Sequence, residues 1–225
     1  MNPIIAEGSG AFLLGRPLNA NPYQKDQFEY KDWESGWRRQ LLLESMGDPE
    51  VVYENPWFKV EKAQNYHWIA GNGQKGAVVM PVRVVDGEYQ VLMVNIFRHL
   101  AGGTQLEIPR GGGEDKDRDA KDTAIRELSE ETGYAVPHQR VELLGHIHTD
   151  SGILKSDLPY FLAWVQETDK ITDVLDEVDE VVWIPMTELR EKIAQGHIKD
   201  SFSICALMLF DSQGRGNESF PKDFF

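Results

Sequence analysis

The sequence predicts an α+β domain preceded by a small, mainly helical segment. Alternating apolar and polar residues, rich in β-branched and aromatic types, recur from about residue 50 onward and indicate strands. One strong helical pattern interrupts these strands at residues 120–132, and two more follow later in the chain. Residues before 50 are polar and rich in turn-forming types. We therefore expect a helical, aromatic segment over 1–48 and an α+β domain over 49–225.

The elements follow from these patterns in chain order. Residues 30–46 predict a helix that places Trp33 and Trp37 one turn apart, with Gly36 as a weak point. Strands are expected at 51–64, 66–71, 75–99, 104–110, 140–149, 158–166 and 180–186, and helices at 186–196 and 201–212. The pair Asp86-Gly87 divides the run at 75–99 and predicts a tight hairpin.

The helix at 120–132 has well-defined ends. Asp117 or Asp119 can cap its first turn, and Gly133 suits the left-handed residue that follows a helix. Its apolar side is formed by Ala120, Ala124, Ile125 and Leu128.

Composition limits the class of protein. The net charge of −14 argues against a general nucleic-acid binder, because phosphate contacts require clustered Lys and Arg. The single cysteine, Cys205, excludes an internal disulfide framework and lies in an apolar run that favours burial. The sequence has neither an apolar run of membrane-spanning length nor a signal-peptide pattern, so we expect a cytoplasmic protein.

Three glutamates crowd one side of the helix at 120–132. Glu127, Glu130 and Glu131 lie within about one turn, where like charges repel. Glutamates on a helix usually form a solvated face, but here Arg126, Gly133 and a glycine-rich loop at 111–113 accompany them. A hard divalent cation would offset the repulsion, and it would also let an acidic protein handle an acidic substrate.

The segment "GGEDKDRDAKDTAIRELSEETGY" resembles the Nudix box, G-x5-E-x7-R-E-U-x-E-E-x-G-U, where U is a bulky apolar residue. Residues 126–134 match its second half. The flanking segments "VLMVNIFRH" and "QLEIPRG" are similar to ADP-ribose pyrophosphatase-like members, and the likeness covers about residues 50–212. The resemblance implies an α/β/α sandwich with a mixed β-sheet.

One part of the box departs from the pattern. If Gly112 opens it, Arg118 stands where the family has a glutamate. If Gly111 opens it, Asp117 fills the acidic position and one residue is inserted before the helix. We favour the second alignment, which also matches the family's proline-glycine turn.

The resemblance implies the site's chemistry. Glu127 and Glu131 would bind Mg²⁺, with Mn²⁺ as an alternative, and Glu130 would be shared between the metal and Arg126. A backbone carbonyl near Gly111 would approach the same ion. For Arg126 itself, an ion pair that positions the helix is the favoured role.

A general base and substrate contacts are also expected. An acidic run before the strand at 180–186 offers a base, for which we favour Glu180 over Glu177, although the run could equally be a solvated loop. Arg98 and Arg110 could hold phosphate oxygens, together with Glu107 of the "QLEIPRG" segment, while Arg98 could equally be a surface residue.

These features predict a Mg²⁺-dependent hydrolase that cleaves the pyrophosphate bond of ADP-ribose, a nucleotide sugar or a dinucleotide. A nucleoside monophosphate would be released. A homodimer is implied by the same subgroup. A nucleotide- or RNA-binding protein without hydrolytic activity, and a hydrolase of RNA caps, remain as alternatives.

The N-terminal segment carries a second resemblance. Asn21-Pro22-Tyr23 and the run "WESGW" at 33–37 are similar to ribosome modulation factor, which implies RNA or ribosome contact through residues 15–40. Residues 1–40 hold equal numbers of basic and acidic side chains, which favours the other interpretation. In that interpretation the aromatic residues pack a small helical appendage.

Overall fold

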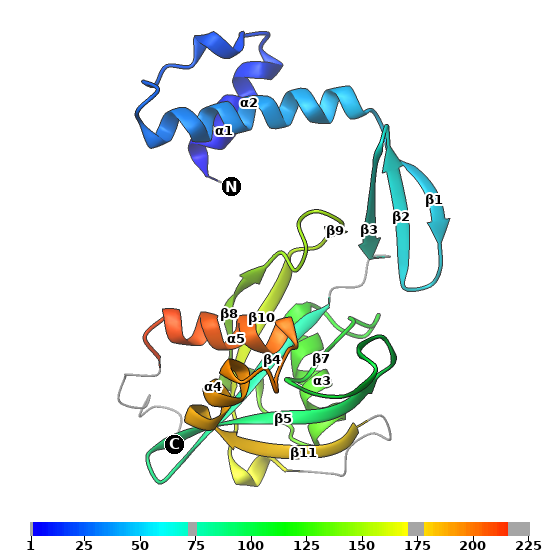
Figure 1. Ribbon diagram of the computed structural model, residues 1–225, viewed down its shortest axis with the longest axis vertical. Coiled ribbons are helices and arrows are strands. Elements are labelled where there is room, and N and C mark those ends of the chain that lie inside the picture. Colours follow the sequence, from blue (N-terminus) through cyan, green and yellow to red (C-terminus); the bar gives the residue numbers. More distant parts are fainter. Residues whose placement is uncertain (1, 72–75, 171–177, 216–225) are drawn as a thin grey trace. The chain divides into compact units, whose positions relative to one another are not determined.

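The computed structural model describes residues 2–71, 76–170 and 178–215. The chain forms two compact units (Figure 1). The first contains Met1–Asn55 and Lys59–Trp68, and the second contains Pro56–Phe58 and Ile69–Phe225. The first unit therefore includes the N-terminal helical segment and most of the residues of the next three strands.

Two helices cross closely in the first unit. They are α1 (Pro3–Leu13) and α2 (Phe28–Met46), and a short 3-10 helix, η1 (Leu18–Ala20), lies between them. A methyl group added to Gly8 would overlap the carbonyl of Trp33, and one added to Gly36 would overlap the carbonyl of Ile5. Glycine at both positions lets the two backbones meet. The sequence predicted α2 but missed α1, and Gly36 is a contact point rather than a weak point.

The aromatic motif of the first unit serves its own packing. Trp33 is 1% exposed. Trp37 stacks edge-on against Phe12 and donates its indole N–H to the carbonyl of Arg16. Tyr23 donates to Glu7 at 3.0 Å. These contacts favour the appendage interpretation, because a buried indole face cannot stack on a base.

Three strands follow the helices. They are β1 (Glu50–Glu54), β2 (Phe58–Ala63) and β3 (Tyr66–Gly71). Strand β1 pairs with β2 in antiparallel register, and the end of β3 pairs with β9 (Leu154–Lys155) at Ile69 and Ala70. The strand predicted over 51–64 is thus two strands, joined by a turn that contains Pro56.

The second unit is built on a mixed seven-stranded sheet. Its main order is β11-β5-β4-β10-β8, with β6 paired to β5 and β7 paired to β4. Strands β10 and β4 are parallel, and the other pairs are antiparallel. The strands are β4 (Ala77–Val85), β5 (Glu88–Arg98), β6 (Gly103–Glu107), β7 (Arg110–Gly111), β8 (Val141–Ile147), β10 (Leu158–Trp164) and β11 (Val178–Pro185).

Helices cover both faces of this sheet. One core cluster joins the sheet to α4 (Met186–Ala194) and α5 (Ser201–Ser212) through residues such as Leu189 and Phe210. The other joins it to α3 (Ala120–Thr132) through Ala124 and Leu128. Short 3-10 helices complete the unit: η2 (His99–Ala101), η3 (His138–Arg140) and η4 (Glu167–Asp169). The α+β fold with helices on both sheet faces is confirmed.

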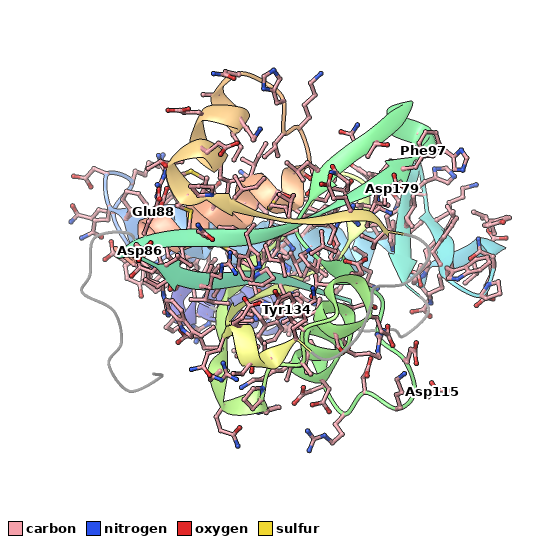
Figure 2. All side chains as sticks on the ribbon, turned by 90° about the horizontal axis from the view of Figure 1, so that it is seen from below. Asp86, Glu88, Phe97, Asp115, Tyr134 and Asp179 are labelled. Atoms are coloured by element: carbon pink, nitrogen blue, oxygen red, sulfur yellow. The ribbon has the colours of Figure 1, made fainter. Side chains whose placement is uncertain are left out.

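The predicted hairpin and helix ends also form as expected. Asp86 and Gly87 both have positive φ, as the tight turn between β4 and β5 requires. Figure 2 shows Asp86 and Glu88 at one end of this hairpin and Phe97 at the far end of β5. Of the two candidate caps for α3, Asp119 is the one used, and Gly133 ends the helix with a φ of 74°. In the part of the chain that the structure describes, no helix is long and apolar enough to cross a membrane.

The helix crossing in the first unit generates a prediction. Gly8→Ala should lower the free energy of unfolding of this unit by about 1–3 kcal/mol, because the helices must separate to admit the methyl group. Hydrogen exchange of the α1 and α2 amides in the full chain measures the change.

Gly10→Ala is the matched control, since nothing lies within 4 Å of the added methyl group on the same helix. It should leave the exchange unchanged or slow it. Equal protection in the two variants would show that the crossing does not depend on glycine.

Candidate active site

One side of helix α3 is buried in the core, and the predicted carboxylates lie on its other side. Thr123, Ala124, Leu128 and Thr132 are buried. This packing leaves Glu127, Glu130 and Glu131 along the side that meets the glycine-rich loop and the end of β7. The side chain of Glu127 is 12% exposed, and that of Glu130 is 34% exposed.

Arg126 ties this side of the helix to the preceding loop. Its guanidinium donates to the carbonyl of Gly112 at 2.6 Å and to the carboxylate of Asp117 at 3.1 Å. The same group lies 2.7 Å from Glu130 and 2.9 Å from Glu127. Arg126 therefore forms ion pairs within the protein, as the sequence analysis favoured, and its donors point at groups on the loop and the helix.

Asp117 is the acidic partner of this arginine. It also accepts from the amide of Glu114 at 2.9 Å and the hydroxyl of Thr123 at 3.1 Å. Burial acts to raise the pKa of Asp117, but the hydrogen bonds from Arg126 and its neighbours outweigh it and lower the pKa. Arg118, by contrast, is exposed and pairs with Asp122. The geometry supports the alignment in which Gly111 opens the box.

The turn before the loop meets two of the glutamates directly. A methyl group added to Gly111 would overlap the carboxylate of Glu127, so a larger residue there would displace the end of that side chain. One residue earlier, the amide of Arg110 donates to Glu131 Oε2 at 3.2 Å. The backbone of residues 110–111 thus lies against both carboxylates.

The electrostatics of these carboxylates fit a cation. Burial raises the pKa of Glu127. Burial, followed by the charge of Glu127, raises the pKa of Glu131 to about 8. Two carboxylates in a poorly hydrated position repel, and a divalent cation between them relieves that repulsion. The donor set is oxygen only, as Mg²⁺ and Mn²⁺ prefer.

A second ion-pair cluster adjoins the turn. Glu107 is 3% exposed and accepts from Arg98 at 2.7 Å and from Arg110 at 2.8 Å. The hydrogen bond to Glu107 raises the pKa of Arg98. The Arg110 guanidinium lies 4.1 Å from the ring centre of Phe202, and its Nε is buried without a hydrogen-bond partner among the described residues. Glu107 therefore orients both arginines.

The contacts of Glu180, the favoured general base, are with β5 rather than with α3. Glu180 pairs with Asn95 across the β11–β5 ladder and accepts from its side chain at 2.9 Å. Glu180 shares one side of β11 with Val182 and Ile184, which belong to the core cluster under α4 and α5. Val181, on the other side of the strand, packs with the core cluster under α3. Glu177 lies outside the described residues.

One further acidic group has metal-ligand spacing. Asp119, Asp122 and His138 place one potential ligand atom each within 4.8 Å of one another. Asp119 already caps α3, accepting from the amides of Lys121 and Asp122, and Asp122 is bound by Arg118. This group serves the start of the helix, and we assign no ion to it.

Comparison with known proteins identifies the family. The model of the NUDIX domain matches residues 74–202. The chain belongs to the Nudix family. It is 32% identical over 187 residues to a GDP-mannose pyrophosphatase of Yersinia enterocolitica, with 73% of this chain and 93% of the relative covered. It is also 37% identical over 95 residues to GDP-mannose pyrophosphatases of Yersinia pestis and Yersinia pseudotuberculosis, with 40% of this chain and 47% of each relative covered.

These relationships establish the reaction class. The protein is a Nudix pyrophosphohydrolase, which hydrolyses the pyrophosphate bond of a nucleoside diphosphate derivative. Nudix enzymes generally use divalent metals, in agreement with the oxygen-rich group on α3. The family assignment and the enzyme class predicted from residues 126–134 are thereby confirmed.

The contact between Gly111 and Glu127 generates a prediction for this Nudix enzyme. Gly111→Ala should reduce hydrolysis about a hundredfold, because the methyl group displaces the Glu127 carboxylate from its place. Turnover of a nucleotide sugar, measured beside thermal unfolding, tests this.

Gly103→Ala provides the control, since an added methyl group there meets nothing within 4 Å. Its turnover should match that of the unmodified protein. Unchanged turnover in Gly111→Ala would mean that the reaction does not depend on the close approach of Gly111 to the Glu127 carboxylate.

Proposed function

We propose that the protein is a Mg²⁺-dependent nucleotide-sugar pyrophosphatase, with GDP-mannose as the first candidate substrate. The products would be a nucleoside monophosphate and a sugar phosphate. The observation that carries the proposal is the paired contact of residues 110–111 with Glu127 and Glu131 in a chain of the Nudix family. The substrate is suggested by the names of the relatives, which are GDP-mannose pyrophosphatases.

Glu127 and Glu131 would hold the cation, and Glu130 would divide its two oxygens between the cation and Arg126. Backbone carbonyls beside Gly111 are placed to assist, because this turn lies against Glu127. When bound, Mg²⁺ neutralises phosphate oxygens and lowers the pKa of a coordinated water. Arg126 keeps the loop and the helix together while the substrate binds.

The two arginines held by Glu107 would bind the substrate's phosphate oxygens. The side chains of Arg98 and Arg110 keep 35% and 24% exposure, so neither is fully enclosed by the protein. A guanidinium offers five donors in a planar fork, which suits phosphate. The buried carboxylate of Glu107 restricts their rotation and so orients those donors.

Water attacks one phosphorus of the pyrophosphate, and the other phosphate leaves with the bridging oxygen. Glu180, and in second place Glu177, would accept the proton of the attacking water. Support for Glu180 is its exposed position at the start of β11. The proposal also includes a homodimer, implied by the resemblance, and a cytoplasmic location, expected from the sequence patterns. RNA or ribosome contact through residues 15–40 remains the weaker alternative.

A product assay tests this function. Purified protein with Mg²⁺, and then with EDTA, is given GDP-mannose, ADP-ribose, a dinucleotide and capped RNA. We expect metal-dependent release of GMP from GDP-mannose. Release of AMP from ADP-ribose alone would correct the substrate, and cleavage of capped RNA alone would favour the RNA alternative.

Glu131→Gln tests the metal assignment. It should abolish Mg²⁺-dependent turnover while the protein keeps its fold, because the neutral amide is a poor ligand for a hard cation. Glu191→Gln on α4 is the control, since that residue is exposed and far along the chain from the box. Full turnover by Glu131→Gln would refute the assignment.

A further inference from the structure

The start of α5 is joined to the turn that carries the active-site backbone. Helix α5 packs on the sheet face opposite α3, yet its first residues contact Ile108 and Arg110. Asp200 caps the helix by accepting from the amide of Ser203 at 2.8 Å. Residues 108–111 therefore connect the start of α5, on one face of the sheet, with α3 on the other face.

Ser203 makes the central bond of this contact. Its hydroxyl lies 2.7 Å from Asp200 Oδ2 and 3.0 Å from the amide nitrogen of Ile108. A carboxylate only accepts and an amide N–H only donates, so the single hydroxyl proton goes to Asp200 and the oxygen accepts from Ile108. Ser203 is 3% exposed and Ile108 is 2% exposed, so water cannot replace either bond.

Arg110 makes the second connection. Its guanidinium packs over the ring of Phe202 at 4.1 Å, and its Nη2 lies 3.8 Å from Asp200 Oδ1. The side chain of Asp200 is only 7% exposed, so this charge is poorly screened. The backbone amide of Arg110 donates to Glu131, which lies on the other side of the turn.

The backbone of residues 108–111 is thus contacted from both faces of the sheet. On one side the amide of Ile108 and the guanidinium of Arg110 are held by α5, and on the other side Arg110 and Gly111 meet the carboxylates of Glu131 and Glu127. We infer that Asp200 and Ser203 are positioning residues of the active site. They hold the turn so that the Arg110 amide orients Glu131. This inference rests on the proposed metal-binding role of Glu131.

A purely structural role for the same residues makes a different prediction. If Asp200 and Ser203 only cap α5, their loss should lower stability and leave cation binding in the folded protein unchanged. If they position the turn, cation affinity should fall even at temperatures where the variant is fully folded. Partners of metal ligands typically affect affinity or activity about ten- to a hundredfold when removed.

The experiment measures Mn²⁺ binding by calorimetry together with the thermal unfolding midpoint. Ser203→Ala should weaken Mn²⁺ binding about tenfold, since the Ile108 amide loses its acceptor and the turn shifts. Ser203→Thr, which keeps the hydroxyl, should restore most of the affinity. Ser201→Ala, an exposed serine of the same helix, should bind Mn²⁺ like the unmodified protein.

A stability control separates the two roles. Leu189→Ala removes a buried side chain of α4 from the same core cluster and should lower the unfolding midpoint without changing Mn²⁺ affinity. A loss of affinity in Ser203→Ala no larger than in Leu189→Ala would overturn the inference. If Ser203→Ala does not fold, Asp200→Asn replaces it. Asparagine still caps the helix, but the charge acting on Ser203 and Arg110 is lost, so severalfold weaker Mn²⁺ binding is expected.

Failure of the proposed function would give a different pattern of Mn²⁺ binding among the variants. If the unmodified protein and Glu131→Gln bind Mn²⁺ equally, Glu131 is not a ligand, and the inference falls with that assignment. If Glu131→Gln loses binding while Ser203→Ala and Asp200→Asn keep it, the metal site stands and the positioning role alone is refuted.

Discussion

Repulsion among the carboxylates of α3 is the constraint on which the candidate active site depends. Three glutamates lie within about one helical turn, and burial, together with the neighbouring negative charge, disfavours the charged forms of Glu127 and Glu131. The fold offsets this with fixed donors. Arg126 lies among Glu127, Glu130 and Asp117, and the backbone of residues 110–111 meets Glu127 and Glu131 from outside the helix. The loop, the turn and the helix are each held through these donors.

Local chemistry made part of this arrangement predictable. The cap of α3, the glycine that ends it and the β4–β5 hairpin each depend on residues within a few positions of one another. Local patterns therefore sufficed for α3 and for the site residues on it, although the functional roles of those residues remain predictions. The first helix was missed, because residues 3–13 contain two glycines and lack the apolar spacing that marks a surface helix.

Contacts between distant residues could not be predicted. Ile108 and Ser203 are 95 positions apart, and no periodicity relates them. The run Asp200-Ser201-Phe202-Ser203 contains a recognisable capping pattern, but that pattern indicates only where a helix begins. Likewise, the sequence named Glu107 as a substrate contact, whereas its burial between Arg98 and Arg110 is a property of the folded sheet.

The ion pair of Asp117 has a consequence for the loop before α3. Aspartate is shorter than glutamate by one methylene group, yet its carboxylate lies 3.1 Å from the Arg126 guanidinium. The same carboxylate accepts from the amide of Glu114 within the loop and from the hydroxyl of Thr123 on the helix. One short side chain thus closes the loop on itself and fastens it to the helix, so the length of the acid and the length of the loop are linked: each limits where the other can be held.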